Sequence, residues 1–380
     1  MTSTRSEDRL PAAAWVAVLS GLGGMGPARL AALLERWDPE EAWLRVVAGD
    51  VHLDPQVVLR ARRLDAALAA RWRQEAGRTD VAGCWAAHAI AGVGVVARGD
   101  GAYPGPLADD IEAPAVLFHL GSLATLDRPR VAVVGTRRCT YAGRMTARAL
   151  GRDLAAAGVC VVSGLARGID GEAHQGALES TMSGGAAPAA VVGTGLEVVY
   201  PRANAELWRR VAALGVVVSE YPLGTCPQAW RFPARNRIIA ALADVVVVVE
   251  SHARGGSLHT VDAALERDRP VMVVPGPVRS PASAGTNDLL VAGSAPVRDA
   301  GDVLVALGLD AAAVTRGQPQ RRPETTLGVT LLDALGWQPA TIEEVAGRVE
   351  APLAQVAVEL SRMERDGLVL RQGSWFERRA

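Results

Sequence analysis

The chain of 380 residues contains no lysine, and all 40 of its basic residues are arginine. This absence excludes mechanisms that need a lysine ammonium, such as the phosphate loop of Walker-type NTPases and the Schiff base of pyridoxal-phosphate enzymes. Any anion must be bound by backbone amides or by guanidinium groups, which suit phosphate oxygens and also stack on nucleobases. Because the formal net charge is only −1, a nucleic-acid site would need several arginines gathered in one place.

Cysteine and long apolar runs are also scarce. The four cysteines are scattered, with no CxxC pair and no ligand-like pairing with histidine. This pattern argues against a metal site and against disulfides, and it favours a reducing compartment. No apolar run approaches the roughly 20 residues that span a bilayer, and the short run Trp15–Leu19 lacks the cleavage site of a signal peptide. We therefore expect a cytoplasmic protein that has no membrane segment, no metal and no other cofactor.

Changes of pattern along the chain predict three domains and a linker. Residues 1–80 are helical and rich in Ala, Leu and Arg, and residues 81–310 hold a lead-in followed by alternating strands and helices. Residues 311–326 lose periodicity and collect Gln, Arg and Pro, as a linker does. Residues 327–380 predict three short helices and a two-stranded hairpin, which is the layout of a winged helix.

A glycine-rich turn lies within the first of these domains. The segment Leu19–Leu30 places Gly-x-Gly between two apolar helical patterns. It resembles the helix-hairpin-helix element of SAM-like domains, in which turn amides can face a phosphate. An ordinary helix–helix connection explains the same residues equally well, and both alternatives stay open.

The central domain predicts an α/β fold, a Rossmann-like doubly wound parallel sheet. Continuous β-branched runs are typical of strands that are buried on both faces. Helical stretches separate these runs, as in a series of βαβ units. The predicted strands are residues 131–134, 159–162, 189–192, 216–218, 245–249 and 271–274, and the predicted helices include residues 142–157, 204–214 and 260–267.

Small residues and arginines follow these strands. In an open parallel sheet, ligands bind beyond the carboxyl ends of the strands. Gly and Ser let backbone amides close on an anion, and the helix N-termini that follow add favourable dipoles. The sequence therefore predicts a phosphate-binding edge that has no catalytic residues. The predicted site residues are Gly135, Thr136, Arg137, Arg138, Ser163, Gly164, Arg167, Gly168, Gly193, Gly195, Arg202, Arg235, Asn236, Arg237, Arg254, Gly255, Gly256 and Ser257.

Two other kinds of site are disfavoured. The first loop is not G-x-G-x-x-G and no ribose-binding acid follows the second strand, which argues against a dinucleotide site. Asp170 and His174 are spaced i,i+4 at the start of a helix, where an acid–base pair could form. We favour a structural interpretation, in which Asp170 caps the helix and His174 packs or hydrogen-bonds beneath the loop.

The motifs of the central domain, in their order along the chain, closely resemble the DNA-processing protein A family (DprA/Smf). They are VAVVGTRR, VVSGLARGIDGEAHQGAL, VVGTGLEVVYPRAN, VVVSEYPLGT, FPARNRIIAALADVVVVVES and GGSLHTVDAALERDRPVMVVPG. The resemblance covers roughly residues 98–307. It implies a non-enzymatic, homodimeric protein that binds and protects single-stranded DNA and loads the RecA recombinase in natural transformation.

The resemblance also implies roles for particular residues. Arg137 corresponds to a phosphate contact, and Arg254 stands at a position that is basic in many relatives. The loop pattern SGxARGxDxxAH runs from Ser163 to His174, and the FPxRNR pattern runs from Phe232 to Arg237. Thr136 stands where serine is usual.

Other interpretations weigh less. A phosphoribohydrolase-like enzyme of the same superfamily would carry a PGGxGTxxE loop, and here Pro275-Gly276 is followed by Pro277-Val278. A transcription regulator is suggested only by the C-terminal domain. Its predicted recognition helix, residues 352–366, mixes basic with acidic residues and favours a protein-interaction or dimer-supporting role. At the phosphate edge, Arg235 or Arg237 could pair with Glu220 or Glu250 and hold the loop instead of touching DNA.

Overall fold

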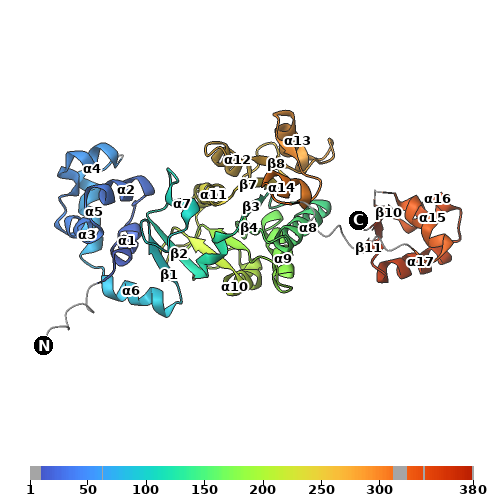
Figure 1. The fold of residues 1–380 in the computed structure, drawn as a ribbon, viewed down its shortest axis with the longest axis horizontal. Helices are drawn as coiled ribbons and strands as arrows, with labels where there is room; N and C mark the ends of the chain where they lie inside the picture. Colours follow the sequence, from blue (N-terminus) through green and yellow to red (C-terminus); the bar gives the residue numbers. More distant parts are fainter. Residues whose placement is uncertain (1–9, 62, 311–322, 337–338, 379–380) are drawn as a thin grey trace. The chain divides into compact units, whose positions relative to one another are not determined.

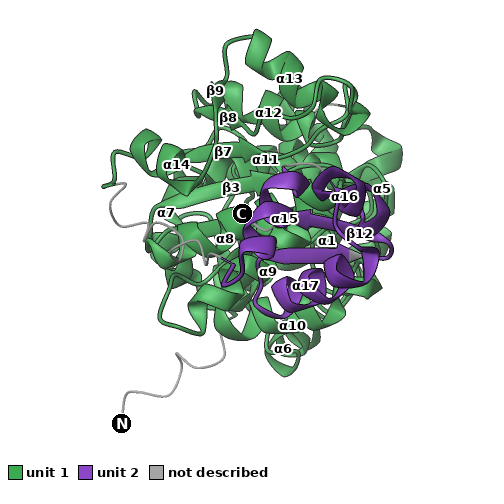
Figure 2. Cartoon of the chain, turned by 90° about the vertical axis from the view of Figure 1, so that its right-hand side faces the viewer, with its two compact units in different colours: residues 1–314 green, residues 315–380 purple. Residues whose placement is uncertain are grey.

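The computed structural model describes residues 10–61, 63–310, 323–336 and 339–378, and the chain divides into two compact units, residues 1–314 and 315–380 (Figures 1 and 2). Most of the predicted linker, residues 311–322, lies outside the described residues. In the part of the chain that the structure describes, no helix is long and apolar enough to cross a membrane.

The first unit begins with a group of helices. Several start at an aspartate whose carboxylate accepts an amide hydrogen bond, namely Asp38, Asp54 and Asp65. Trp72, which is fully buried, sits at the centre of their core. These helices are α1 (Ala12–Gly21), α2 (Pro27–Arg36), α3 (Pro39–Ala48), α4 (Pro55–Arg60), α5 (Ala66–Ala76) and α6 (Val81–Ile90), with the short 3-10 helix η1 (Val51–Leu53) before α4.

The glycine-rich turn between α1 and α2 forms hydrogen bonds with side chains of α5. The Gly23 amide donates to Glu75 Oε2 at 2.7 Å, and the Gly23 carbonyl accepts from the Trp72 indole at 3.0 Å. A carboxylate from α5 therefore occupies the turn amide that could have faced a phosphate. Of the two alternatives for this turn, the structure favours the ordinary helix–helix connection.

A nine-stranded sheet follows, in the order β1-β2-β6-β5-β4-β3-β7-β8-β9. All six predicted strands are present, and their pairing is parallel from β6 to β9. The strands are β1 (Gly94–Ala97), β2 (Val116–Gly121), β3 (Arg130–Val134), β4 (Cys160–Ser163), β5 (Ala189–Val192), β6 (Val216–Ser219), β7 (Val245–Val248), β8 (Val271–Val273) and β9 (Ala295–Pro296).

The edge formed by β1 and β2 departs from the prediction of an entirely parallel sheet. These two strands pair antiparallel with each other, and β2 pairs antiparallel with β6. Four prolines break residues 80–130 into short pieces, which hid both strands in the sequence. The sheet is therefore mostly parallel, with an antiparallel extension built from the lead-in segment.

Helices cover both faces of the sheet, and each valine-rich strand divides its side chains between them. In β7, Val245 and Val247 face one layer while Val246 and Val248 face the other, and all four are buried. The first layer contains α8 (Tyr141–Ala156), α9 (Ile169–Thr181) and α14 (Ala300–Ala306), and towards β2 it passes into α10 (Ala205–Leu214) and the N-terminal helices. The second layer contains α7 (Gly105–Ala108), α11 (Arg231–Leu242) and α12 (Leu258–Leu265), and α13 (Ala284–Val291) lies in the segment between β8 and β9.

The direction of winding reverses next to β3. The chain runs from β3 outward through β4, β5 and β6, then returns through α11 to place β7 on the other side of β3. Loops after β3 and β7 therefore diverge at the carboxyl edge and leave a crevice between them, which is where ligands bind in doubly wound sheets.

The second unit is a small winged helix with its own apolar core. A capping box begins α16, because Glu344 N donates to Thr341 Oγ1 and the Glu344 carboxylate accepts from Thr341 N. The hairpin predicted near the end of the chain is also present. The elements are α15 (Thr326–Leu335), β10 (Ala340–Thr341), α16 (Ile342–Val349), α17 (Leu353–Arg365), β11 (Val369–Gln372) and β12 (Trp375–Arg378), with strand order β10-β12-β11.

Candidate functional site

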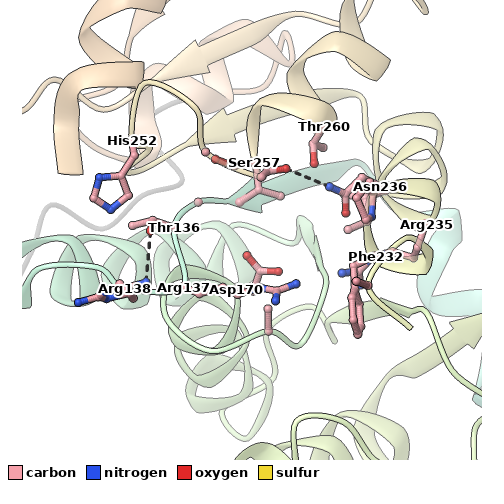
Figure 3. A pocket seen from close by; sticks show the side chains of 18 of the residues that line it. Thr136, Arg137, Arg138, Asp170, Phe232, Arg235, Asn236, His252, Ser257 and Thr260 are labelled. Carbon is pink, nitrogen blue, oxygen red and sulfur yellow. Dashed lines mark hydrogen bonds between the residues drawn. The ribbon is translucent and has the colours of Figure 1, made fainter. Parts of the chain in front are cut away.

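A pocket of about 630 Å³ lies at the point where the winding reverses. Most of its lining comes from the loop after β3, the loop after β7, and the start of α11 with the residues before it (Figure 3). Ala166, Asp170 and Tyr200 also line it. A second pocket of about 600 Å³ adjoins the first and shares Arg137 and Arg138 with it. Of the predicted site residues, the first pocket gathers Gly135, Thr136, Arg137, Arg138, Arg235, Asn236, Arg254, Gly255, Gly256 and Ser257, and the second adds Arg167 and Gly168.

The loop after β3 is held from below by the end of β7. Thr136 N donates to the Glu250 carbonyl at 2.8 Å, and the Glu250 carboxylate accepts from Thr140 N at 2.8 Å and from Thr140 Oγ1 at 2.5 Å. Because these bonds join two neighbouring strands, the backbone that carries Arg137 and Arg138 is fixed before any ligand binds.

Gly168 closes the loop after β4 against the loop after β3. Its φ of +80° lies in the region that favours glycine, and a Cβ at this position would collide with the Thr136 carbonyl. The Asn204 side chain donates to the carbonyls of Leu165 and Ala166 from the other side. The glycine that the sequence assigned to phosphate binding is therefore also required for the two loops to approach.

Four exposed arginines of the predicted site line the two pockets: Arg137, Arg138, Arg167 and Arg254. Among the described residues, none of the four forms an ion pair with an acid. The Arg137 guanidinium lies 5.1 Å from the centroid of the Phe232 ring, within the range of a cation–π contact. Figure 3 shows Arg137 and Arg138 on the loop after β3 and Phe232 on α11 opposite. These four arginines supply unpaired positive charge to the pockets.

Arg235 has a different environment from these four. Its side chain is 3 % exposed, and its guanidinium donates to the Gly164 carbonyl at 3.0 Å and to the Val191 carbonyl. Burial lowers the pKa of Arg235 to about 10, so the group stays protonated at neutral pH. The guanidinium lines the bottom of the pocket while its hydrogen bonds join the ends of β4 and β5.

Arg237 forms the ion pair that the sequence left open for one of the two arginines. Its guanidinium donates to Glu220 Oε2 at 2.6 Å, and both side chains are largely buried. Burial raises the pKa of Glu220 in spite of that partner. Arg237 lines neither pocket. Its position corrects the expectation that both arginines stand at the rim, because α11 turns residue 237 away from the crevice.

Asp170 and His174 are both buried, as the structural interpretation required. His174 Nε2 lies 3.1 Å from the Ala189 carbonyl oxygen, and burial lowers the His174 pKa to about 4. Asp170 does not cap α9, which corrects one detail, since Gly168 is the N-cap residue and the Asp170 carboxylate accepts from Gly164 N at 3.2 Å. Burial raises the Asp170 pKa, against the opposing charges of Arg235 and Arg137.

Several predicted residues lie outside the two pockets. Ser163 is buried and donates to the Val133 carbonyl at 2.7 Å, and Gly195 N donates to the Thr225 carbonyl. Arg202 is exposed at the start of the short helix η3 (Arg202–Asn204). Their positions follow from the loop paths, which the order of residues does not specify. The predicted residues that line neither pocket are Ser163, Gly164, Gly193, Gly195, Arg202 and Arg237.

The aromatic side chains around the pocket were not predicted from the sequence. Tyr200 stacks on Phe232 with ring centroids 5.2 Å apart, and both rings line the pocket. Tyr221 meets Trp230 edge to face just before α11. One signal was available: the chain has only 16 aromatic residues, yet these four lie in loops or at a helix start after buried strands, where a core does not need them.

Fold and site together define a Rossmann-like α/β protein with an arginine-rich pocket at its topological switch point. Residues 94–308 match the family described as DNA recombination-mediator protein A. Protein Smf of Escherichia coli is 36 % identical over 274 residues, covering 70 % of this chain and 72 % of that protein. The DNA processing protein DprA of Streptococcus pneumoniae is 42 % identical over 205 residues, covering 54 % of this chain and 71 % of that protein. The chain therefore belongs to the DNA recombination-mediator protein A family.

Solved structures agree with this assignment. The X-ray structure of S. pneumoniae DprA superposes with a TM-score of 0.62 at 33 % identity, covering 77 % of this chain and 95 % of that chain. A structure of DNA processing protein A from Helicobacter pylori, described for its single-stranded DNA binding mode, gives a TM-score of 0.51 at 28 % identity. It covers 57 % of this chain and 95 % of that chain.

Proposed function

We propose that this protein binds single-stranded DNA at the carboxyl edge of its sheet and delivers the strand to a RecA recombinase. One observation carries the proposal: unpaired arginines and stacked aromatic rings line the same preformed pocket. Guanidinium groups neutralise phosphates, whereas aromatic rings accept bases that are not already stacked in a duplex. The single-stranded DNA binding described for the H. pylori relative supports the same ligand.

We further propose that the strand is bound without being cleaved or modified. The ionisable side chains that line the first pocket are its arginines, Tyr200, His252 and Asp170. Asp170 is buried beneath the loop, with its carboxylate bonded to Gly164 N. The Ser257 hydroxyl donates to Ser251 Oγ at 3.0 Å instead of meeting a base. These partners suit a rigid binding surface.

Dimerisation and RecA binding belong to the proposal through the family resemblance. We place the surface for these contacts around residues 288–307, where Val291 on α13 and Val305 on α14 are both exposed. Sedimentation velocity of the full chain, alone and with a single-stranded oligonucleotide, tests the dimer. A monomer under both conditions would contradict this part of the proposal and leave the DNA site untouched.

Titration with DNA at graded salt tests the site. The protein is titrated with single-stranded DNA, duplex DNA and free mononucleotides at salt concentrations between about 50 and 300 mM. The logarithm of the association constant, plotted against the logarithm of the salt concentration, should have a slope of about −0.7 for each neutralised phosphate. We expect strong preference for the single strand. Arg137→Ala and Arg254→Ala should each weaken binding of all sequences alike and reduce the slope by about 0.7.

Arg209→Ala is the matched control for these variants. Arg209 is also exposed, but it lies on α10 and pairs with Glu206 at 2.6 Å. Its removal should leave affinity and slope unchanged. Unchanged affinity in both Arg137→Ala and Arg254→Ala would show that the strand binds elsewhere. Turnover of a mononucleotide would favour an enzyme related to the phosphoribohydrolases.

A further inference from the structure

Three consecutive residues at the start of α11 point into two different environments. Side chains one position apart on a helix diverge by about 100°, since a turn contains 3.6 residues. Phe232 faces the pocket, where it contacts Arg137 and Tyr200. Trp230 does not line the pocket and belongs to a second cluster with Tyr221. Arg231 lies between them in the sequence.

Trp230 is both exposed and held in place. Its side chain is 59 % exposed, although its indole Nε1 donates to Gln228 Oε1 at 2.7 Å. The Tyr221 ring meets it edge to face, with centroids 6.4 Å apart and an interplanar angle of 84°. The Arg231 guanidinium lies 5.1 Å from the Trp230 centroid and 5.0 Å from the Tyr221 centroid. An aromatic ring fixed in this way loses little conformational entropy when it binds a ligand.

The contacts of Arg231 and Gln228 tie this cluster to the pocket. Arg231 donates to the Cys226 carbonyl and so closes residues 226–231 into a tight loop. Gln228, which holds the Trp230 indole, lines the first pocket together with Pro227 and Ala229. A chain that leaves the pocket over these three residues therefore reaches the Trp230 ring next.

An exposed indole backed by a guanidinium fits a planar, electron-delocalised ligand. Unpaired nucleobases have this character and stack on aromatic rings whatever their sequence, whereas the bases of a duplex are already stacked. The guanidinium also favours the negative charge of the backbone that carries the base. The cluster therefore suits the same single strand whose phosphates the pocket would neutralise.

We propose that Trp230, backed by Arg231 and Tyr221, is a second stacking platform, which receives a nucleobase of the strand as it leaves the pocket. This inference rests on the proposed function and extends it from phosphate binding to the path of the strand. Purines offer more stacking surface than pyrimidines. Substitution of Trp230 should therefore weaken binding of oligo(dA) more than binding of oligo(dT).

An abasic scan of short oligonucleotides tests the platform. A single abasic nucleotide is moved along the oligonucleotide, and affinity is measured for the wild type, Trp230→Ala and Trp230→Phe. We expect Trp230→Ala to weaken binding of the intact strand about tenfold, within the range of one stacked base, and Trp230→Phe to retain most of the affinity. At one abasic position the difference between wild type and Trp230→Ala should disappear, because the partner base is already missing.

The matched control is Trp375→Ala, which removes an indole that is 46 % exposed on β12 of the second unit. This variant should bind as the wild type does. The salt slope should be the same in Trp230→Ala as in the wild type, because a stacking contact neutralises no phosphate. Circular dichroism checks that each variant is folded.

The outcomes separate this inference from the proposed function. If Arg137→Ala weakens binding while Trp230→Ala does not, the platform is wrong and the strand site stands. If Trp230→Ala weakens binding equally at every abasic position, the indole acts through the fold and the platform is wrong. If the wild type binds no single-stranded DNA at all, the proposed function fails, and the platform fails with it.

Discussion

Arginine serves two purposes at the edge of this sheet. The exposed guanidiniums of Arg137 and Arg254 have no acidic partner in the described part of the chain and are available to an anion. Arg235 is buried and bonds to backbone carbonyls, while Arg237 pairs with Glu220. A buried ammonium would more readily lose its proton, whereas a guanidinium keeps its charge. A chain without lysine can therefore use one residue type both for structure and for binding.

Arg235→Ala should destabilise the fold. Its guanidinium joins the ends of β4 and β5 and counteracts the charge of Asp170, which is also buried. Removing one member of a set of buried charges costs about 3–5 kcal/mol. We expect a loss of this order in the free energy of unfolding, measured by urea denaturation. Arg254→Ala is the control and should stay within about 0.5 kcal/mol of the wild type. Equal stability of the two variants would mean that Arg235 is not structural.

His174 should make the protein less stable in mild acid. Burial lowers its pKa to about 4 in the folded chain, against about 6.5 in the unfolded chain. As the pH falls through this window, the unfolded state takes up the proton first, so the free energy of unfolding decreases by up to about 1.4 kcal/mol per pH unit from this group. Stability is regained as the pH rises again.

Urea denaturation measures this dependence at pH 7, above the reference pKa of about 6.5, and at pH 6 and 5, below it. Burial raises the pKa values of Asp170 and Glu220, and those groups oppose the effect of His174. The comparison is therefore made with His174→Gln, which can keep a hydrogen bond to the Ala189 carbonyl. The variant should show a flatter pH dependence than the wild type, and parallel curves would exclude His174 as the cause.

The end of β7 supports the binding edge of the sheet. Glu250 follows this strand and holds the loop after β3 by its backbone carbonyl and by its carboxylate. The same strand leads into the loop that carries Arg254, and α11 brings its N-terminus to the crevice because it runs antiparallel to the strands. The loops after β3 and β7, which are distant in the sequence, therefore share one support.

Glu250→Ala should weaken binding although the side chain is buried beneath the loop. Without the carboxylate, Thr140 N loses its partner, at a cost of about 1–3 kcal/mol, and the loop that carries Arg137 becomes more mobile. We expect faster hydrogen exchange in residues 135–143 and a several-fold loss of single-stranded DNA affinity. Glu250→Gln retains an acceptor, and its single-stranded DNA affinity should lie between those of the wild type and Glu250→Ala. Reduced affinity with unchanged exchange would contradict this indirect role.

The whole molecule consists of two units with separate apolar cores. On α17 of the second unit, Arg362 pairs with Glu324 and lies near Asp366. The helix that a winged-helix DNA reader would insert into a groove therefore offers little unpaired positive charge. In the first unit, by contrast, the loops of the sheet edge carry arginines without acidic partners among the described residues.

A chain that ends at residue 310 should keep the affinity for single-stranded DNA. The pockets and the aromatic clusters lie within the first unit, and their supporting contacts do as well. We expect the same dissociation constant within about twofold and the same salt slope as for the full chain, since no phosphate contact is lost. A large loss of affinity would assign the second unit a direct part in binding.

The order of residues already specifies the sheet and the edge at which the site forms. Buried parallel strands need continuous β-branched runs, so β3 to β8 could be predicted from the residues alone, and the Gly and Arg residues that follow β3 and β7 marked the crevice. The antiparallel strands β1 and β2 escaped notice because short pieces interrupted by proline carry no such pattern.

Packing between distant segments distinguishes the paired arginines of the edge from the unpaired ones. Arg235 and Arg237 stand two positions apart in one motif, yet α11 buries the first beneath the pocket and turns the second towards Glu220. The same folding gathers Tyr200 and Phe232, 32 residues apart, into one stack beside Arg137. Composition and spacing give the type of each side chain and its place in the chain. The partners of a side chain depend on the path that each loop takes beyond the sheet, because contacts between distant segments determine which atoms meet.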